Sequence, residues 1–390
     1  MTSIQQRYAA GADVALVAFF LMLINLPLVM QVFFGAEKEI PEERRLLRHM
    51  PRLRLDTWTI KEFPRLFEGC YSDHFRLRRQ MVRAHHLAKL SIFNDSPCAA
   101  VVLGKDGWLF YDGKARNDGD PIADYRGTRP MTGEQCFQWE AVTRARASWL
   151  ASRNVRYVFV VAPNKETIYS EYMPDCLRPL STNSPMNQLT GYASGIANLW
   201  FMDIRHVLKK ASGSHQVYSK TDTHWNSYGA FVAYDAIMRL VSGWFPAVAV
   251  RTRDDFTISY GRQRGGDLAG LLALSDHLVE PAAPVFCSKS FVSVNPLPGR
   301  PASDEERCTE SSDLPTAVVF HDSFGMALIP FLTPHFGRIV FRGVGEEFDK
   351  ALIDNVKPQL VVTILCERNL RGICTPSPPG DEGLVNRQLR

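Results

Sequence analysis

The stretch AVVFHDSFG, residues 317–325, decides the fold of this chain. Four apolar residues come first, as in a buried strand, and a polar turn then leads into an apolar segment of helical spacing. Equivalent apolar runs stand at residues 157–163 (YVFVVAP) and 360–365 (LVVTIL), with helical segments between them. Strands of this kind, alternating with helices, are typical of a parallel sheet that is covered on both faces. We therefore predict an α/β fold with one doubly wound, mostly parallel sheet.

The composition is that of a globular protein with a sizeable core. Of 390 residues, 45% are hydrophobic and 22% are charged, which excludes a disordered or fibrous chain. The formal net charge of +4 comes from 45 basic and 41 acidic residues that are scattered along the sequence. This pattern lacks the basic footprint of a nucleic-acid-binding protein. We therefore expect no nucleic-acid partner.

Eight cysteines are present, without CxxC pairs and without the spacing to histidine that metal sites show. We therefore predict no metal site, and no motif indicates a cofactor. In an oxidising compartment Cys287 and Cys308 are the disulfide candidate, because both lie in a Pro/Ser-rich segment that a crosslink would hold together. Cys366 and Cys374 are a second possible pair, and buried thiols are the alternative.

Ser323 stands where a predicted strand ends and a helix begins. This context lifts a serine hydroxyl clear of the sheet and places the serine N–H at a helix N-terminus, where it can stabilise an oxyanion. In open parallel sheets, ligands bind at the carboxyl ends of the strands, which is where Ser323 is expected. The alternative is a helix cap, the commoner role of a serine in this position.

Asp222 and His224 form a second candidate feature, in the segment TDTHW that precedes a predicted helix. Residues two apart on an extended segment face the same side, so the carboxylate can accept the Nδ1 proton and leave Nε2 free to take a proton from Ser323. Both features are expected at the same edge of the sheet. We predict a Ser-His-Asp acyl-transfer site with Ser323 as nucleophile, His224 as base and Asp222 as the residue that orients the base.

Further residues are candidates for holding a substrate or its oxyanion. Asn164 and Lys165 directly follow the first apolar run, so the Asn164 amide could donate to an oxyanion and Lys165 could pair with a substrate carboxylate or a neighbouring acid. Tyr169, Arg264 and Arg368 are candidates for binding a polar substrate. The alternative for each is a structural role, for example in a turn.

The apolar run from Val14 to Phe34, VALVAFFLMLINLPLVMQVFF, has 21 residues, enough to cross a bilayer as a helix. A cleaved signal peptide has a shorter apolar core and a small-residue cleavage site, and the residues around Phe34 fit such a site poorly. We predict an uncleaved N-terminal transmembrane helix. A cleaved signal and a buried core helix are the alternatives.

The charges around this run indicate one orientation and the expected chemistry another. Arg7 is the only basic side chain before the run, while Lys38, Arg44, Arg45 and Arg48 follow it, so the positive-inside rule places the body in the cytoplasm. We nevertheless expect an exported body, because no second spanning segment is seen and an extracytoplasmic acyl acceptor suits the predicted site. The predicted location is the inner membrane, single-pass, with the catalytic domain in the periplasm.

The domain organisation follows from these patterns. The segment before the sheet is rich in Arg, Glu and aromatic residues at helical spacing, which predicts amphipathic helices on the membrane-proximal side. Within the sheet domain we expect an irregular insertion between about residues 278 and 314. The predicted parts are a membrane anchor (1–35), a helical segment (36–96), the sheet domain (97–378) and a C-terminal tail (379–390).

Segments spread over about residues 97–370 resemble the SGNH-hydrolase-like domain of the AlgX and AlgJ alginate O-acetyltransferases and their relatives in other exopolysaccharide acetylation systems. Their order along the chain is more specific than any one motif. The segments are GKDGWLFYDG, VVAPNKETIYSEYMP, TDTHWNSYGA, GGDLAGLL, VVFHDSFG and ILCERNL.

The resemblance implies the same catalytic residues. In the family a D-x-H motif supplies the acid and the histidine, which correspond to Asp222 and His224, and the serine of a GTS- or GDS-like turn corresponds to Ser323. The D-x-H motif precedes the serine in the family, as it does here. His321 replaces the glycine that often opens the serine turn. We therefore expect a differently built oxyanion hole, with His321 packed in the fold or stabilising the turn.

The resemblance also implies the activity and the partners. The expected enzyme is a serine-dependent O-acetyltransferase that passes acetyl groups to hydroxyls of an exported polysaccharide such as alginate. The acetyl donor is expected from a membrane-bound O-acyltransferase. The polymer is expected to bind in the domain's own groove or through a partner, since the family's carbohydrate-binding module has no counterpart here. Two alternatives are a carbohydrate acetylesterase with the same triad and a catalytically silent polysaccharide-binding scaffold.

Overall fold

The protein is described here by a computed structural model that divides the chain into two compact units. One unit comprises residues 1–94 with 388–390, and the other comprises residues 95–387. The described residues are 13–22, 25, 48–52, 57–75, 78–282, 284–288, 293–296, 304–309, 311, 313–343 and 348–374.

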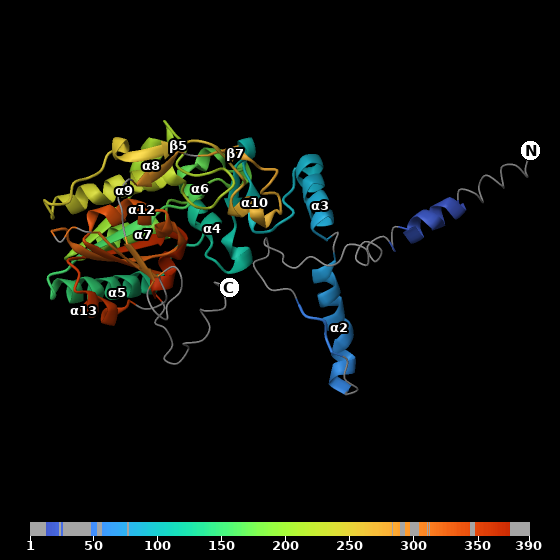
Figure 1. The fold of residues 1–390 in the computed structure, drawn as a ribbon, viewed down its shortest axis with the longest axis horizontal. Coiled ribbons are helices and arrows are strands. Elements are labelled where there is room, and N and C mark those ends of the chain that lie inside the picture. Colours follow the sequence, from blue (N-terminus) through green and yellow to red (C-terminus); the bar gives the residue numbers. More distant parts are fainter. Residues whose placement is uncertain are drawn as a thin grey trace, which may run out of the picture. The chain divides into compact units, whose positions relative to one another are not determined.

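The second unit is built on a seven-stranded sheet (Figure 1). Its strands lie in the order β4, β3, β13, β11, β12, β10, β9, and the first five are parallel. Strand β10 pairs antiparallel with both β12 and β9. The mostly parallel α/β sheet predicted from the sequence is therefore confirmed. The strands are β3 (Arg156–Ala162), β4 (Leu199–Asp203), β9 (Ser293–Pro296), β10 (Glu305–Cys308), β11 (Thr316–His321), β12 (Arg338–Gly343) and β13 (Leu360–Cys366).

Alternate residues of β3 point to opposite faces of the sheet, and helices cover each face (Figure 1). Val158 and Val160 belong to one core with α8, α9 and α12, whereas Phe159 and Val161 belong to another with α5, α7 and α13. Because both faces are buried, apolar residues are needed at every position of the strand, and the run is unbroken. The helices are α5 (Gly133–Ala151), α7 (Pro185–Ala193), α8 (Arg205–Ser212), α9 (Ser227–Ser242), α12 (Ile329–Leu332) and α13 (Lys350–Val356).

The longer helices of this unit begin at side-chain caps. Thr132 and Gln135 form a reciprocal capping box at α5, and Ser184 caps α7. Asn226 caps α9 by accepting a hydrogen bond from a backbone N–H of its first turn. This cap ends the extended segment that carries His224 just before the helix starts.

Smaller elements complete the second unit. Strands β1 and β2 form a hairpin, β5 pairs with β8, and β6 pairs with β7, all antiparallel. These strands are β1 (Val101–Leu103), β2 (Leu109–Tyr111), β5 (Phe256–Ser259), β6 (Arg262–Gln263), β7 (Glu280–Pro281) and β8 (Val285–Ser288). The short helices are α4 (Pro121–Arg126), α6 (Lys165–Ile168), α10 (Asp267–Leu271), α11 (Ser323–Met326), η2 (Lys105–Gly107), η3 (Gly113–Arg116), η4 (Ser170–Tyr172), η5 (Asp175–Leu177), η6 (Arg253–Asp255), η7 (Thr333–His335) and η8 (Glu367–Cys374).

The segment 278–314, predicted to be an irregular insertion, instead supplies strands β7, β8, β9 and β10. Two of them extend the central sheet, so the prediction of irregular structure is wrong for these residues. Strand β10 consists of the polar sequence Glu-Glu-Arg-Cys, and Glu306 forms an ion pair with Arg338 of β12 (2.8 Å). A half-buried strand near a sheet edge pairs through its backbone and such ion pairs, and therefore lacks the apolar run that marks a central strand.

The first unit contains helices α2 (Thr57–His74) and α3 (Arg78–Phe93), which lie within the segment predicted to be helical. Residues 13–22 are helical as well. Within the described residues, no helix has both the length and the apolar character needed to cross a bilayer. Residues 23–24 and 26–34 of the predicted transmembrane run lie outside this description, so the membrane anchor stays a prediction.

The structure contradicts one of the two predicted disulfides. Cys366 is buried at the end of β13, where its thiol donates to Asn164 Oδ1 (3.2 Å) and forms no disulfide. The possible Cys366–Cys374 pair is therefore wrong, because the core side of β13 directs Cys366 toward Asn164. The Cys287–Cys308 pair stays a prediction, since the side chain of Cys287 lies outside the described residues.

Replacing Phe159 by alanine tests the core assigned to β3. Phe159 is 0% exposed, so we expect the variant to lose about 3–5 kcal/mol of unfolding free energy, measured by urea denaturation of the full chain. The matched control is Phe137→Ala on α5, whose side chain is 68% exposed and whose loss should cost less than about 0.5 kcal/mol. Equal losses in the two variants would contradict this core.

Candidate active site

The turn after β11 exposes Ser323 while its neighbour Asp322 caps the helix. Asp322 Oδ1 accepts the Phe324 N–H (3.0 Å), and Oδ2 accepts hydrogen bonds from the Cys366 N–H (2.6 Å) and from Asn369 Nδ2 (3.0 Å). Ser323 is the first residue of α11 and is exposed. Because Asp322 is the cap, the helix-cap alternative for Ser323 is wrong, and the serine hydroxyl is free for other contacts.

The serine turn is tight because Gly325 lies against His321. A Cβ on Gly325 would lie 2.3 Å from the His321 Cβ, so a side chain there would force the turn apart. His321 is 1% exposed, donates from Nδ1 to the Asp322 carbonyl (2.8 Å), and has its pKa lowered by burial. The expectation that His321 is packed and stabilises the turn is confirmed.

His224 connects the serine turn to the extended segment before α9. Its Nε2 lies 2.9 Å from Ser323 Oγ, and its Nδ1 lies 2.9 Å from Asp222 Oδ1. The backbone N–H of His224 donates to the same carboxylate oxygen (2.8 Å). Asp222 thus orients the ring so that Nδ1 donates to the carboxylate and Nε2 faces the serine. The structure brings the three predicted residues together within hydrogen-bonding distance.

Aromatic side chains hold these two segments together. Trp225 Nε1 donates to the Phe324 carbonyl (3.0 Å), and the Phe324 ring packs against His224 and Trp225 with centroid distances of 4.9 and 5.3 Å. Trp225 and Phe324 are both buried. Since Trp225 follows His224 and Phe324 follows Ser323, these contacts fix the distance between the imidazole and the serine hydroxyl.

The segment that carries Asp222 rests on the buried Lys165. The Lys165 side chain donates from Nζ to the carbonyls of Ser219 (3.3 Å), Lys220 (3.1 Å) and Asp222 (2.6 Å). Lys165 is 2% exposed, and this burial lowers its pKa to about 8. The first turn of α6 directs the ammonium group beneath the segment instead of toward solvent. Lys165 is therefore a structural support, which corrects its predicted contact with a substrate.

Glu280 also supports this segment. Its carboxylate accepts the N–H groups of Lys220 (2.8 Å) and Thr221 (3.2 Å) and the Thr221 hydroxyl. Glu280 is 7% exposed, so its carboxylate has lost most of its hydrating water. These donors replace the hydrogen bonds of that water. The segment before His224 is thus held by charged hydrogen bonds on its carbonyl groups and on its N–H groups.

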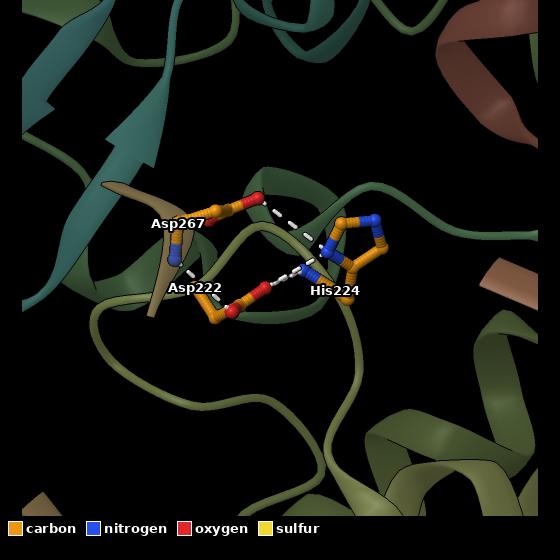
Figure 2. A group of neighbouring side chains, drawn as sticks. All are labelled: Asp222, His224 and Asp267. Atoms are coloured by element: carbon orange, nitrogen blue, oxygen red, sulfur yellow. Dashed lines mark hydrogen bonds and ion pairs between the residues drawn. The ribbon is translucent and has the colours of Figure 1, made fainter. Parts of the chain in front are cut away.

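A second carboxylate reaches His224 from α10 and was not among the predicted site residues. Asp267 Oδ2 lies 3.4 Å from His224 Nδ1, and the Asp267 N–H donates to Asp222 Oδ2 (3.2 Å; Figure 2). A Cβ on Gly266 would lie 2.3 Å from Asp222 Oδ2, so glycine is needed where the segments meet. The sequence signal is GGDL, in which glycines that permit close approach precede an acid at a helix start.

Two carboxylates determine the charge of His224. Burial by itself lowers the pKa of His224, but the hydrogen bonds and charges of Asp222 and Asp267 outweigh burial and raise the pKa to about 9. The two carboxylates therefore favour the protonated form of the imidazole in the resting site. Burial acts to raise the pKa of Asp267, and contacts with His224 and Thr223 outweigh it and lower that pKa.

Asp222, His224 and Asp267 are also close enough to be considered as metal ligands. Their potential ligand atoms lie within 4.8 Å of one another. These atoms are already hydrogen-bonded, His224 Nδ1 with Asp222 Oδ1 and Asp267 Oδ2 with the Thr223 hydroxyl. A cation would have to replace the Nδ1 proton and compete with these bonds. We therefore interpret the group as a hydrogen-bonded cluster of acids and histidine and not as a metal centre.

Asn164 and Tyr169 are packed into the fold. Asn164 is 1% exposed, and its backbone N–H donates to Glu367 Oε2 (2.9 Å). Its Nδ2 has no hydrogen-bond partner among the described residues, so a role at an oxyanion stays a proposal that requires this amide to become accessible. Tyr169 is 3% exposed, and its hydroxyl accepts the Val217 N–H (2.9 Å). This internal hydrogen bond corrects the predicted role of Tyr169 in substrate binding.

Arg264 and Arg368 differ in their surroundings. Arg264 is on the surface, where its side chain is 81% exposed and forms an ion pair with Asp276 (3.3 Å). Arg368 is 9% exposed, and its guanidinium carbon lies 5.4 Å from the centre of the Tyr111 ring and 5.5 Å from that of Phe324. The Phe324 contact places Arg368 beside the serine turn. Both arginines stay candidates for binding a polar substrate.

The fold and the site together define an SGNH-hydrolase-like protein, with a mostly parallel α/β sheet and an exposed serine within reach of a histidine at the end of one strand. Comparison with protein families agrees with this class. The family described as "SGNH hydrolase-like domain, acetyltransferase AlgX" matches residues 101–325, more than half of the chain. The chain belongs to this family.

Individual relatives are similar over part of the chain. The probable alginate O-acetylase AlgJ of Pseudomonas putida is 29% identical over 178 residues, which are 45% of this chain and 42% of that protein. The chain thus matches less than half the length of this relative.

Two solved structures are similar in fold. Bacillus cereus PatB1 with a sulfonyl adduct has a TM-score of 0.52 at 15% identity, over 71% of this chain and 100% of that chain. A DHHW family protein from Eubacterium siraeum has a TM-score of 0.50 at 15% identity, over 70% of this chain and 95% of that chain. At these identities the likeness shows the fold alone.

Replacing Gly266 by alanine tests the contact between the two acidic segments. The new Cβ would lie 2.3 Å from Asp222 Oδ2, so the carboxylate must move and its hydrogen bond to His224 is disturbed. We expect the reaction of Ser323 with a sulfonyl fluoride, followed by intact mass, to slow by about 100-fold. Gly270→Ala, in the helix α10 that Gly266 precedes, adds a Cβ at an ordinary van der Waals distance and should leave the rate unchanged. Unaltered reactivity in both variants would contradict the assigned contact.

Proposed function

We propose that this chain is a serine-dependent O-acetyltransferase that transfers acetyl groups to hydroxyls of an exported polysaccharide such as alginate. The observation that carries the proposal is the 2.9 Å contact between His224 Nε2 and Ser323 Oγ, with Asp222 on the opposite ring nitrogen. Membership of the AlgX acetyltransferase family supports the acetyl-transfer chemistry. The partial match to a probable alginate O-acetylase supports a polysaccharide acceptor.

In the first half-reaction Ser323 becomes acetylated. Neutral His224 accepts the Oγ proton at Nε2 while Oγ attacks the carbonyl carbon of the acetyl donor. The bond between Oγ and carbon forms, the bond from carbon to the donor's leaving atom breaks, and Nε2 delivers the proton to that leaving atom. Asp222 keeps the ring oriented and stabilises the imidazolium between the two proton transfers.

In the second half-reaction a sugar hydroxyl takes the acetyl group. His224 Nε2 accepts the hydroxyl proton as the sugar oxygen attacks the ester carbon, the bond from carbon to Oγ breaks, and the proton passes to Oγ. Ser323 is exposed, which is a requirement if the acceptor is a polymer. Water in place of the sugar would make the protein an acetylesterase.

The tetrahedral intermediate requires hydrogen-bond donors for its oxyanion. In the serine turn, the Phe324 N–H donates to Asp322 Oδ1 (3.0 Å) and the Gly325 N–H donates to the Asp322 carbonyl (3.0 Å). We therefore assign the backbone N–H of Ser323 as the first donor. Asn164 Nδ2 would be a second donor only if the buried amide became accessible.

The proposal includes the location and the donor predicted from the sequence. A single-pass protein of the inner membrane, with its catalytic domain in the periplasm, would receive acetyl groups from a membrane-bound O-acyltransferase. An alkaline phosphatase fused to the C-terminus folds to an active enzyme only outside the cytoplasm, and we expect such a fusion to be active. A stable but inactive fusion would place the C-terminus in the cytoplasm and would contradict an exported polymer as the acceptor.

Replacing Ser323 by alanine tests the activity itself. The purified chain is incubated with a nitrophenyl acetate donor and alginate oligosaccharides, and acetylated sugar is measured by mass spectrometry. We expect the unchanged chain to form acetylated sugar and Ser323→Ala to form at least about 1,000-fold less, because the acyl-enzyme cannot form. The control is Ser194→Ala, an exposed serine at the end of α7, which should act as the unchanged chain does.

Two outcomes of this experiment would favour the alternatives. Donor hydrolysis that is unaffected by the sugar, without acetylated sugar, would make the protein an esterase. A Ser323→Ala variant that binds the polymer and still supports full acetylation in cells would make the protein a scaffold.

A further inference from the structure

Asp267 contacts all three residues of the Asp222-Thr223-His224 motif. The Asp267 N–H donates to Asp222 Oδ2 (3.2 Å), Oδ1 accepts the Thr223 N–H (2.7 Å), and Oδ2 accepts the Thr223 hydroxyl. Oδ2 also lies 3.4 Å from His224 Nδ1, which Figure 2 shows beside the shorter contact to Asp222. One residue outside the motif therefore helps to hold every member of the motif in place.

The segment that carries Asp267 is held against the motif by its backbone. The Gly266 N–H donates to Thr221 Oγ1 (2.9 Å), and the Leu268 N–H donates to the Thr221 carbonyl (3.1 Å). Thr221 is itself bound by the buried carboxylate of Glu280. These hydrogen bonds flank Asp267 on both sides and fix its backbone. The position of its carboxylate beside the imidazole is therefore set by the fold and does not depend on the rotamer of a mobile surface side chain.

Two carboxylates lie beside the same nitrogen of the imidazole, Nδ1. Within the described residues, the charged side chains that contact His224 are Asp222 at 2.9 Å and Asp267 at 3.4 Å. Lys165 adds a positive charge behind Asp222, where its Nζ donates to the backbone carbonyl, and the Phe324 ring covers His224 without charge. A single opposite charge within this distance can shift the pKa of a side chain by about one to three units.

We propose that Asp267 is a positioning residue of this site: it is a second carboxylate on His224 Nδ1, holds the ring together with Asp222, and stabilises the protonated imidazole while Ser323 is acylated. This inference rests on the proposed function and deepens it, since two acids instead of one contact the catalytic base. When Nε2 takes the proton from Ser323 Oγ, the ring becomes positive, and two carboxylates stabilise that charge better than one.

The second acid has a consequence for the pH dependence. The pKa of His224 is raised to about 9, so the neutral base needed to deprotonate Ser323 is scarce at pH 7 and becomes abundant as the pH rises toward 9. Removing the Asp267 charge lowers that pKa, which makes the neutral base available at lower pH. A residue that only supported the fold would not move this inflection.

The first experiment is a pH titration of the His224 imidazole by nitrogen NMR in the full chain, with the signal assigned through its loss in His224→Gln. We expect an inflection near pH 9 in the unchanged chain. Asp267→Asn should lower it by about one to three units. Asp267→Glu keeps the carboxylate and should retain most of the elevation. The control Asp276→Asn removes the same charge from the partner of exposed Arg264 and should leave the inflection in place.

An unchanged inflection in folded Asp267→Asn, or an equal shift in Asp276→Asn, would overturn the proposal. Thermal unfolding establishes that each variant is folded. Asp267→Ser is a second neutral variant, whose hydroxyl is short but polar. Should Asp267→Asn fail to fold, the same downward shift is expected in Asp267→Ser, and its absence there would overturn the proposal equally.

The second experiment separates this inference from the proposed function. The rate at which phenylmethylsulfonyl fluoride modifies Ser323 is measured against pH by intact mass, and its inflection should fall in Asp267→Asn as the NMR inflection does. If Ser323 of the unchanged chain does not react while the NMR inflection shifts, the acyl-transfer proposal fails and the role of Asp267 stands. If Ser323 reacts with the same inflection in both chains, the role of Asp267 fails and the acyl-transfer proposal stands.

Discussion

The hydrogen bond between His224 Nε2 and Ser323 Oγ is the interaction on which the rest of the site depends, and it joins residues that are 99 positions apart. A serine hydroxyl is a weak nucleophile unless a base lies within reach of its proton. Neither segment places its residue alone. The serine needs the Asp322 cap and the tight turn at Gly325, the histidine needs Asp222, and buried aromatic contacts join the two.

Beneath this hydrogen bond lies a layer of buried charged groups. The buried Lys165 and Glu280 satisfy carbonyl and N–H groups of the segment before His224, and the half-buried Asp322 satisfies donors from the neighbouring strand end. Burying a charge is unfavourable unless hydrogen bonds replace its water, and each of these groups has several. Such groups are rigid because moving one leaves a buried charge unpaired, so they hold the exposed side chains in place.

The prediction from sequence succeeded where the physical cause is local or periodic. Central strands buried on both faces produce unbroken apolar runs, and β3, β11 and β13 were found in this way. Strand β10 was missed because a half-buried strand next to the sheet edge pairs through its backbone and ion pairs and needs no apolar run. For Lys165 and Tyr169 the sequence left substrate binding and a structural role open, because a pattern does not show which way a polar side chain turns after a strand. Both turn inward.

The sequence by itself determined the α/β sheet, the serine at a strand end and the Asp222-His224 pair, since spacing along an extended segment already places two side chains on one side. Only the tertiary structure decided that Asp267 completes this pair. Its contact with the motif spans 44 residues and depends on how one loop packs against another at Gly266. Such packing depends on shape, backbone donors and buried charges contributed by several segments, and no local pattern contains that information.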